Sequence, residues 1–258
     1  MASNNAYGPQ VITDGLAWCV DANSPRSYPG GGGIYWYDLS SSKQAVSTLT
    51  NGPSFVAATD TEPAHMLFDA TNEYIAHPDL ASFNNVSVEI VFKTTDKNSE
   101  MFGLSTTTST TAPNAGFCTL ASGDQVFFFR FNSAYDNSGT TGGANWNDRP
   151  YKRAYGTYTA DVWKHYVGTY TQVDNQVGDV IALYENGKLV DISDQSNTPA
   201  SQYAHQYESA TFQGGLGGGT SAGYHFLGSV AFVRVYTRAL TPVEVKQNFN
   251  STRSRFGL

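Results

Sequence analysis

The stretch that decides the fold is "FLGSVAFVRVYTRALTPVEVKQNF", which runs from Phe226 to Phe249. Its first half is almost continuously apolar and predicts a buried β-strand over Phe226–Tyr236. Its second half carries a helix start signal, because Thr241 is the expected N-cap, Pro242 takes the first helical position and Glu244 follows the cap by three residues. The stretch predicts a β domain that ends in one short helix. Such a helix must dock on the domain, since a helix of this length is not stable alone in water.

Alternation between apolar and polar residues runs through the rest of the chain. The segments "VSVEIVFKT" (Val86–Thr94) and "VWKHYVGTY" (Val162–Tyr170) predict strands with a buried face. "VIALYENGKLVDI" (Val180–Ile192) predicts two strands joined at Asn186-Gly187, a dipeptide that suits a turn with positive φ at both central residues. "VFFFRFN" (Val126–Asn132) is apolar on both faces for most of its length, which predicts a central strand covered on both sides.

About a dozen short strands, separated by turns rich in Gly, Ser, Asn and Thr, predict one all-β domain built as a sandwich or a barrel. The Gly-rich stretches Pro29–Gly33 and Gly214–Gly223 are expected to be loops. The remaining candidate strands are Leu16–Asp21, His65–Phe68, Tyr74–Ala76, Met101–Leu104, Gly116–Leu120, Tyr155–Tyr158 and Ser209–Phe212.

Composition narrows the classes of partner. Only 14% of the 258 residues are charged, and the net charge is −7, so no basic patch is expected that would neutralise nucleic-acid phosphates. No run approaches the ~20 apolar residues of a membrane helix, and "MASNNAYGPQ" at the start lacks an apolar signal core. Cys19 and Cys118 both lie in apolar stretches, which favours two buried free thiols and leaves a disulfide as the alternative.

The closing stretch resembles the last strand and helix of the concanavalin A-like, laminin-G-like jelly-roll family. Four earlier stretches agree with the family in order: "LFDATNEYI" from Leu67, "VSVEIVFK" from Val86, "WKHYVGTY" from Trp163 and "LYENGKLV" from Leu183. The resemblance implies a jelly-roll sandwich of two antiparallel sheets with one short C-terminal helix. It implies an N-terminal extension over residues 1–14 and a single laminin-G-like domain over 15–258. The residues that form the family's structural signature are Trp163, His165, Arg234, Tyr236, Thr241 and Glu244.

Both ends of the chain resemble a subgroup of this family found in tailed-bacteriophage virions. The matching segments are Gly15–Ser42, Leu49–Phe55 and "NFNSTRSRFGL" (Asn248–Leu258). The resemblance implies a non-enzymatic structural protein on the virion surface, as capsid decoration, head fibre or tail fibre. It implies other virion proteins and further copies of this chain as partners. It also implies synthesis in the host cytoplasm without a signal peptide, with no membrane or nucleic acid as partner.

Catalytic residues are not expected. Retaining glycosidases on this fold need two carboxylates about 5 Å apart. Glu89 stands alone on its strand, Glu185 precedes a turn, Glu208 has no carboxylate near it and Glu244 caps a helix. A stand-alone carbohydrate-binding lectin module and a glycosidase on the same fold remain the alternatives to a virion protein.

The longest expected loop, Asn132–Arg153, is the candidate glycan site, since loops of this length in compact domains are often functional. A sugar stacks its apolar face on an aromatic ring while its hydroxyls bond polar side chains. The loop supplies Tyr135, Trp146 and Tyr151 for stacking and Asn145, Asn147 and Asp148 for hydrogen bonds, which makes cell-surface glycans candidate partners. The alternative is that Trp146 pins the loop to the body or to a neighbouring subunit. A second aromatic cluster, "YWYD" (Tyr35–Asp38), is expected to pack as structure.

Calcium is the one candidate cofactor, and the resemblance points to Asp69 as a ligand. The alternative is that the Asp69 side chain shapes a turn by bonding nearby backbone N–H groups. Ala231 and Phe232 stand where many relatives carry acidic residues, and the five histidines do not cluster with metal-ligand spacing.

Overall fold

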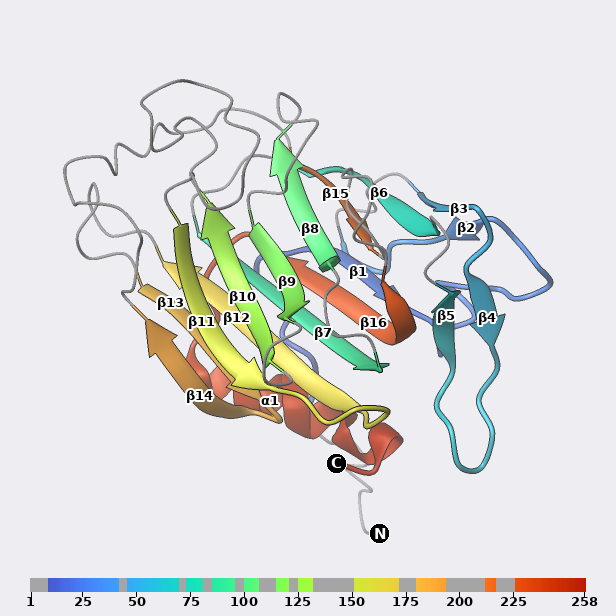
Figure 1. Ribbon diagram of the computed structural model, residues 1–258. Helices are drawn as coiled ribbons and strands as arrows, with labels where there is room; N and C mark the ends of the chain where they lie inside the picture. Colours follow the sequence, from blue (N-terminus) through green and yellow to red (C-terminus); the bar gives the residue numbers. More distant parts are fainter. Residues whose placement is uncertain are drawn as a thin grey trace, which may run out of the picture.

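The computed structural model describes residues 9–41, 46–69, 73–80, 85–95, 100–106, 115–120, 125–131, 151–171, 180–193, 212–216 and 226–258. The chain forms two antiparallel sheets that pack face to face, with helix α1 (Pro242–Thr252) and the short 3₁₀ helix η3 (Arg253–Phe256) at its end (Figure 1). The predicted all-β sandwich with a short C-terminal helix is confirmed.

The first sheet is organised around its longest strand, β16. Residues 227–230 of β16 pair with β5, and residues 232–236 pair with β1 on the same side, while β7 lies along the other side. In order the strands are β14 (Lys188–Ser193), β13 (Val180–Glu185), β12 (Lys164–Thr171), β7 (Val86–Thr94), β16 (Leu227–Tyr236), β5 (His65–Asp69) and β4 (Ser54–Val56), with β1 (Leu16–Asp21) beside β16.

The second sheet runs from β11 to β2. In order its strands are β11 (Tyr151–Thr157), β10 (Gln125–Phe131), β9 (Ala115–Leu120), β8 (Glu100–Thr106), β15 (Phe212–Leu216), β6 (Tyr74–Leu80), β3 (Ser47–Thr50) and β2 (Tyr35–Trp36). Strand β10 is hydrogen-bonded to β9 and β11, but the prediction that it is central is wrong, because it lies second from the edge of the sheet. Its neighbour β11 is shielded by the first sheet, since the backbone N–H of Tyr155 donates to Asp191 Oδ2 of β14 at 2.7 Å.

Aromatic side chains fill the space between the sheets. Phe92 stacks on Tyr166 with ring centroids 5.2 Å apart, and Phe117 meets Phe128 at 5.1 Å. Gly168 on β12 permits the close approach of the two layers, because a Cβ there would lie 2.1 Å from Cγ of Phe128. The hydrophobic effect of burying these rings stabilises the sandwich.

Several element boundaries differ from the sequence-based expectation. Strand β11 begins at Tyr151, so the last three residues of the loop expected over Asn132–Arg153 belong to a strand. The reason is that Tyr151–Arg153 continue the ladder with β10. The strand expected over Ser209–Phe212 is β15, Phe212–Leu216, which pairs with β6 and β8 despite its two glycines. Strands β2, β3 and β4 were not predicted. Cys19 is buried and free, as expected.

The predicted turn and helix are confirmed. Asn186 and Gly187 have φ of 50° and 72°, and a complete capping box starts α1 at Thr241. Val245 and Phe249 are buried as expected, and the helix runs on to Thr252. Among the described residues, no helix has the length and apolar character required to cross a membrane.

Candidate functional site

The carboxylate of strand β7 lies in the interior, under helix α1. Glu89 is 0% exposed, and Arg234 of β16 is its direct cross-strand partner. Arg234 Nη1 donates to Glu89 Oε1 at 2.7 Å, and His165 Nε2 of β12 lies 2.9 Å from the same oxygen. Since an ionised carboxylate only accepts hydrogen bonds, Nε2 carries the proton in this pair.

The second carboxylate oxygen is also occupied. Asn248 Nδ2 of α1 donates to Glu89 Oε2 at 2.8 Å, and the Tyr236 hydroxyl lies 3.3 Å away. Burial alone would raise the pKa of Glu89, but the charge of Arg234 and the hydrogen bonds from His165 and Asn248 lower it below its usual range. We call Glu89, His165, Arg234, Tyr236 and Asn248 the Glu89 cluster. It ties three strands to α1 and leaves no free oxygen for a substrate.

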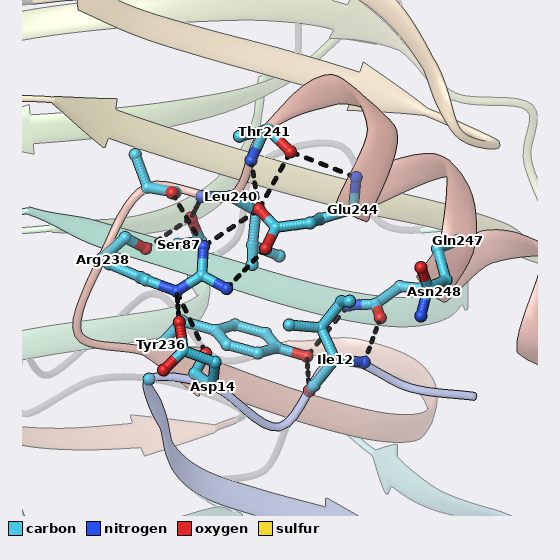
Figure 2. Close-up of polar contacts among 12 residues, drawn as sticks. Ile12, Asp14, Ser87, Tyr236, Arg238, Leu240, Thr241, Glu244, Gln247 and Asn248 are labelled. Atoms are coloured by element: carbon cyan, nitrogen blue, oxygen red, sulfur yellow. Dashed lines mark hydrogen bonds and ion pairs between the residues drawn. The ribbon is translucent and has the colours of Figure 1, made fainter. Parts of the chain in front are cut away.

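A second polar group holds the start of α1 (Figure 2). Arg238 makes two bonds to Glu244, from Nη2 to Oε1 at 2.6 Å and from Nη1 to Oε2 at 2.9 Å, and its Nε lies 2.9 Å from Asp14 Oδ2. Glu244 also accepts from the backbone N–H of Thr241 at 2.8 Å. The bond from Arg238 is the main cause that lowers the pKa of Glu244 to about 2. The signature residues Thr241 and Glu244 therefore fix the helix start.

The segment before residue 15 lies against the same helix. The N–H of Ile12 donates to Asn248 Oδ1 at 2.8 Å, and the Tyr236 hydroxyl lies 3.2 Å from the Ile12 carbonyl oxygen (Figure 2). Gln247 Nε2 donates to the carbonyl of Gln10 at 2.8 Å. Residues 10–14 thus share hydrogen bonds with the domain expected to begin after them.

Trp163, the remaining signature residue, anchors the loop between β4 and β5. Its side chain is nearly buried, and Nε1 donates to Glu62 Oε2 at 3.0 Å. Lys93 Nζ lies over the indole ring at 5.4 Å and bonds Glu62 Oε1 at 3.0 Å. Trp163 lines a groove of about 370 Å³ between this loop and η3. With its N–H bonded and a cation over its ring, the indole serves as a structural contact.

The predicted glycan residues fall mostly outside the described part of the chain. Tyr135, Asn145, Trp146, Asn147 and Asp148 all lie there, and their assignment stays a prediction. Tyr151 is the first residue of β11, opposite Phe131 of β10.

Asp69 is the last residue of β5 and is exposed. Its backbone N–H donates to Oε2 of Glu73 at 2.7 Å, and Glu73 is buried. Burial and the nearby carboxylate of Asp69 raise the pKa of Glu73. Across the described ranges, no group of three or more His, Cys, Asp or Glu residues lies close enough together to hold a metal ion. Asp69 as a calcium ligand remains a prediction.

The edge strand β2 carries an exposed aromatic surface that the sequence analysis assigned to packing. Trp36 is 0% exposed as expected, but Tyr35 and Tyr37 on either side of it are 45% and 39% exposed. Ile34, just before Tyr35 in the chain, is 54% exposed, and Val46, just before the Trp36 partner Ser47 on β3, is 39% exposed. We call Ile34, Tyr35, Tyr37 and Val46 the tyrosine ridge. The signal available in the sequence was alternation, which turns the residues on either side of a buried Trp outward.

Strand ends that border four long segments of the chain gather at one end of the sandwich (Figure 1). Phe131 pairs with Tyr151 there in the second sheet, and Thr171 pairs with Val180 in the first. The segments that begin and end at this loop end are 107–114, 132–150, 172–179 and 194–211. The turn at Asn186-Gly187 lies at the opposite end, where Gly187 contacts Phe249 of α1.

The profile of one protein family, a laminin-G type described as the concanavalin A-like lectin/glucanases superfamily, matches residues 69–246. No curated protein sequence matches the chain. Solved structures match in fold. Domain 4 of AbnA, a GH43 extracellular arabinanase from Geobacillus stearothermophilus in complex with arabinotriose, is 18% identical, with 93% of this chain and 100% of that chain covered and a TM-score of 0.57.

Two further structures cover most of this chain but only part of their own. Trypanosoma rangeli sialidase in complex with the inhibitor DANA is 14% identical, with 98% of this chain and 36% of that chain covered and a TM-score of 0.60. The receptor-binding domain of the botulinum neurotoxin C/D mosaic serotype is 12% identical, with 92% and 51% covered and a TM-score of 0.57. At these identities the likeness concerns the fold alone, and the fold predicted from the sequence is confirmed.

Proposed function

The chain belongs to the concanavalin A-like lectin/glucanase superfamily, and we propose that it is a non-enzymatic structural protein of a phage virion that holds glycans at the particle surface. The coarser part of this statement, a lectin/glucanase fold whose structural neighbours include carbohydrate-binding proteins, rests on the family match and the solved structures. The absence of catalysis, the virion setting and the adhesive role are the proposal.

The burial and the hydrogen bonds of Glu89 are the observation that supports a non-enzymatic role. A retaining glycosidase needs two accessible carboxylates about 5 Å apart. Glu89 is fully buried, Arg234, His165 and Asn248 donate to its two oxygens, and the Tyr236 hydroxyl lies 3.3 Å from Oε2. Elsewhere in the described residues, Glu185 is paired with Lys164 and Glu244 with Arg238. These acids act as structural groups, which supports binding without cleavage.

Glycan binding is supported by the loop end and by the nature of one structural neighbour. The loop end brings together the ends of strands from both sheets, and it includes Tyr151 and the borders of segment 132–150, which holds the other predicted sugar contacts. Domain 4 of the arabinanase was solved with arabinotriose on the same fold. We extend sugar binding to this chain as part of the proposal, with neutral cell-surface or environmental glycans as the ligands.

The virion setting rests on the resemblance of both chain ends to phage structural proteins. In the structure these two segments touch. Arg255 Nη1 of the closing segment lies 2.7 Å from Asp21 Oδ2 of the opening segment. The two matching segments therefore form one unit of the fold, which is compatible with their having one shared origin.

The virion setting is tested by mass spectrometry of purified phage particles. We expect this chain in many copies per particle. Its absence from particles would remove the virion role and favour the second candidate, a stand-alone lectin module.

The adhesive role is tested on a glycan array. Wild-type protein is compared with Trp146→Ala and with the matched control Leu189→Ala, which removes an exposed side chain on β14 far from segment 132–150 in sequence. We expect binding by the wild type and the control and a clear loss in Trp146→Ala. Equal binding by all three proteins would show that Trp146 in segment 132–150 does not contribute to glycan binding.

A further inference from the structure

We propose that the tyrosine ridge is a second glycan-contact surface, which receives the apolar faces of one or two neutral sugar rings. The inference extends the proposed glycan-binding role, because it adds a contact at an edge of the molecule that the predicted site does not include. Strand β2, which carries the ridge, is the last strand of the second sheet, and β11 with Tyr151 is at the other edge (Figure 1).

The ridge offers the surface that a sugar ring needs. Tyr35 and Tyr37 lie on the same side of an extended backbone, with ring centroids 6.4 Å apart at an angle of 60°. Both rings are partly exposed, and neither hydroxyl is bonded within the described residues. A tyrosine combines an apolar ring with a polar tip, so each can stack on a sugar face and bond a sugar hydroxyl. None of the four side chains of the ridge is charged, which selects a neutral ligand.

The ridge is held rigidly from behind. The N–H of Tyr37 donates to the carbonyl of Ser27 at 2.8 Å, and Ser27 Oγ donates to the carbonyl of Tyr37 at 2.7 Å. The N–H of Leu49 on β3 donates to the Ile34 carbonyl at 2.8 Å. Trp36 anchors the strand in the core. Because these groups are already ordered, a ligand that stacks on the ridge costs little conformational entropy of the protein.

The loop before the ridge has open space around its glycines. Gly30, Gly31 and Gly32 all have positive φ, and a Cβ built on any of them would meet no atom within 4 Å. The Tyr28 hydroxyl donates to the carbonyl of Gly33 at 3.0 Å and fixes the end of this loop. The chain just before the ridge therefore presents backbone without side chains over Gly30–Gly32.

The size of the ridge favours a sugar over a protein partner. A specific protein interface buries about 800 Å² on each side and involves about 20–30 residues, whereas the ridge consists of four side chains. Strand β2 has two residues, so it offers few backbone groups for the addition of a partner strand. A small ligand with a flat apolar face fits better.

The test uses titration calorimetry with four neutral hexasaccharides as probes: cellohexaose, maltohexaose, laminarihexaose and chitohexaose. The double variant Tyr35→Ala/Tyr37→Ala removes both rings, and Tyr35→Phe/Tyr37→Phe keeps the rings without the hydroxyls. Leu189→Ala is the control, because Leu189 is also 50% exposed but lies on β14. Circular dichroism and thermal melting check that each variant folds.

We expect at least one hexasaccharide to bind the wild type, with Kd raised about tenfold in the double Ala variant. The Phe variant should lose less affinity than the Ala variant. The Kd of the control should stay within about twofold of the wild-type value. If the wild type binds and a folded double Ala variant binds with the same Kd, the ridge is not a glycan contact. The proposed function would still stand. No binding of any probe by the wild type would contradict both. Concentration-dependent self-association that disappears in the double Ala variant would show that the ridge is a contact between copies.

Discussion

Arg234 and Glu89 face each other across the β7–β16 ladder, fully enclosed, with Nη1 2.7 Å from Oε1. Two charges are retained in the core only when each is satisfied, because an unpaired buried charge is strongly destabilising. The other partners of Glu89 come from β12, the end of β16 and α1. The pair therefore joins segments that are far apart in the sequence, and Glu89 acts as a structural residue.

Replacing Arg234 with methionine should destabilise the protein by about 3–5 kcal/mol, because Glu89 would be left buried without its countercharge. Glu89→Gln/Arg234→Met should be less unstable than the sum of the two single variants, since the double variant buries no unpaired charge. Urea unfolding followed by fluorescence measures the free energy of unfolding of the two single variants and the double variant. Strict additivity would mean that the two side chains are not energetically coupled.

Stability should fall as the pH is lowered from about 5 toward 2. The pKa of Glu244 is lowered from 4.5 to about 2 in the folded state, and that of Glu89 is also lowered. A group with a depressed folded pKa stabilises the fold above its unfolded pKa and loses that contribution as the pH falls through its folded pKa. The free energy of unfolding should thus decline less steeply over this range in Glu244→Gln than in wild type.

The control for the pH experiment is Asp60→Asn, since Asp60 is exposed and forms no ion pair among the described residues. Its pH profile should follow that of the wild type. If Glu244→Gln and wild type gave parallel profiles between pH 5 and 2, the bidentate pair with Arg238 would not contribute to acid stability.

Gly168→Ala should cost about 1–3 kcal/mol or more, because the new Cβ would lie 2.1–2.5 Å from three ring atoms of Phe128. Gly33→Ala is the matched control. Its Cβ would meet only the Gly30 carbonyl oxygen, at 3.8 Å, and its φ lies outside the left-handed region. Thermal melting should show a clear drop in Tm for the first and little change for the second. Equal Tm values would mean that the sheets can separate without cost at β12.

Removal of residues 9–14 should loosen helix α1. The deletion removes the hydrogen bonds that join Ile12 to Asn248 and Tyr236 and Gln10 to Gln247, each worth about 1 kcal/mol. Amide hydrogen exchange should become faster across α1, while Val243→Ala, a change of an exposed side chain on the same helix, should leave it as in wild type. Unchanged exchange in the deletion variant would show that this segment contributes nothing to docking of the helix.

The sequence predicts the elements whose signal is local. Strands β7 and β12, the turn at Asn186-Gly187 and the capped helix follow from alternation, a turn dipeptide and a capping box. Strand β15, "FQGGL", was placed too early, because pairing with β6 and β8 on both sides outweighs the low strand preference of its glycines. Strands β2 to β4 have two to four residues and are set by their neighbours.

The candidate site was harder to predict than the fold. Glu89 meets His165, Arg234 and Asn248 at sequence separations of 76, 145 and 159 residues, so no spacing rule could have joined them. The motif "YWYD", read as one unit, predicts packing for Tyr35 and Tyr37 as well as for Trp36, whereas only Trp36 is buried. Alternation around the buried tryptophan contained the correct orientation.

The most direct test of the central claim follows protein and sugar together by proton NMR, with the wild-type chain and each of the four hexasaccharides. The account predicts saturation transfer from protein to at least one hexasaccharide while its anomeric signals stay constant over days. Growth of new reducing-end anomeric signals that is abolished in a folded Glu89→Gln variant would contradict it, because a buried carboxylate bonded by Arg234, His165 and Asn248 would then be acting on substrate.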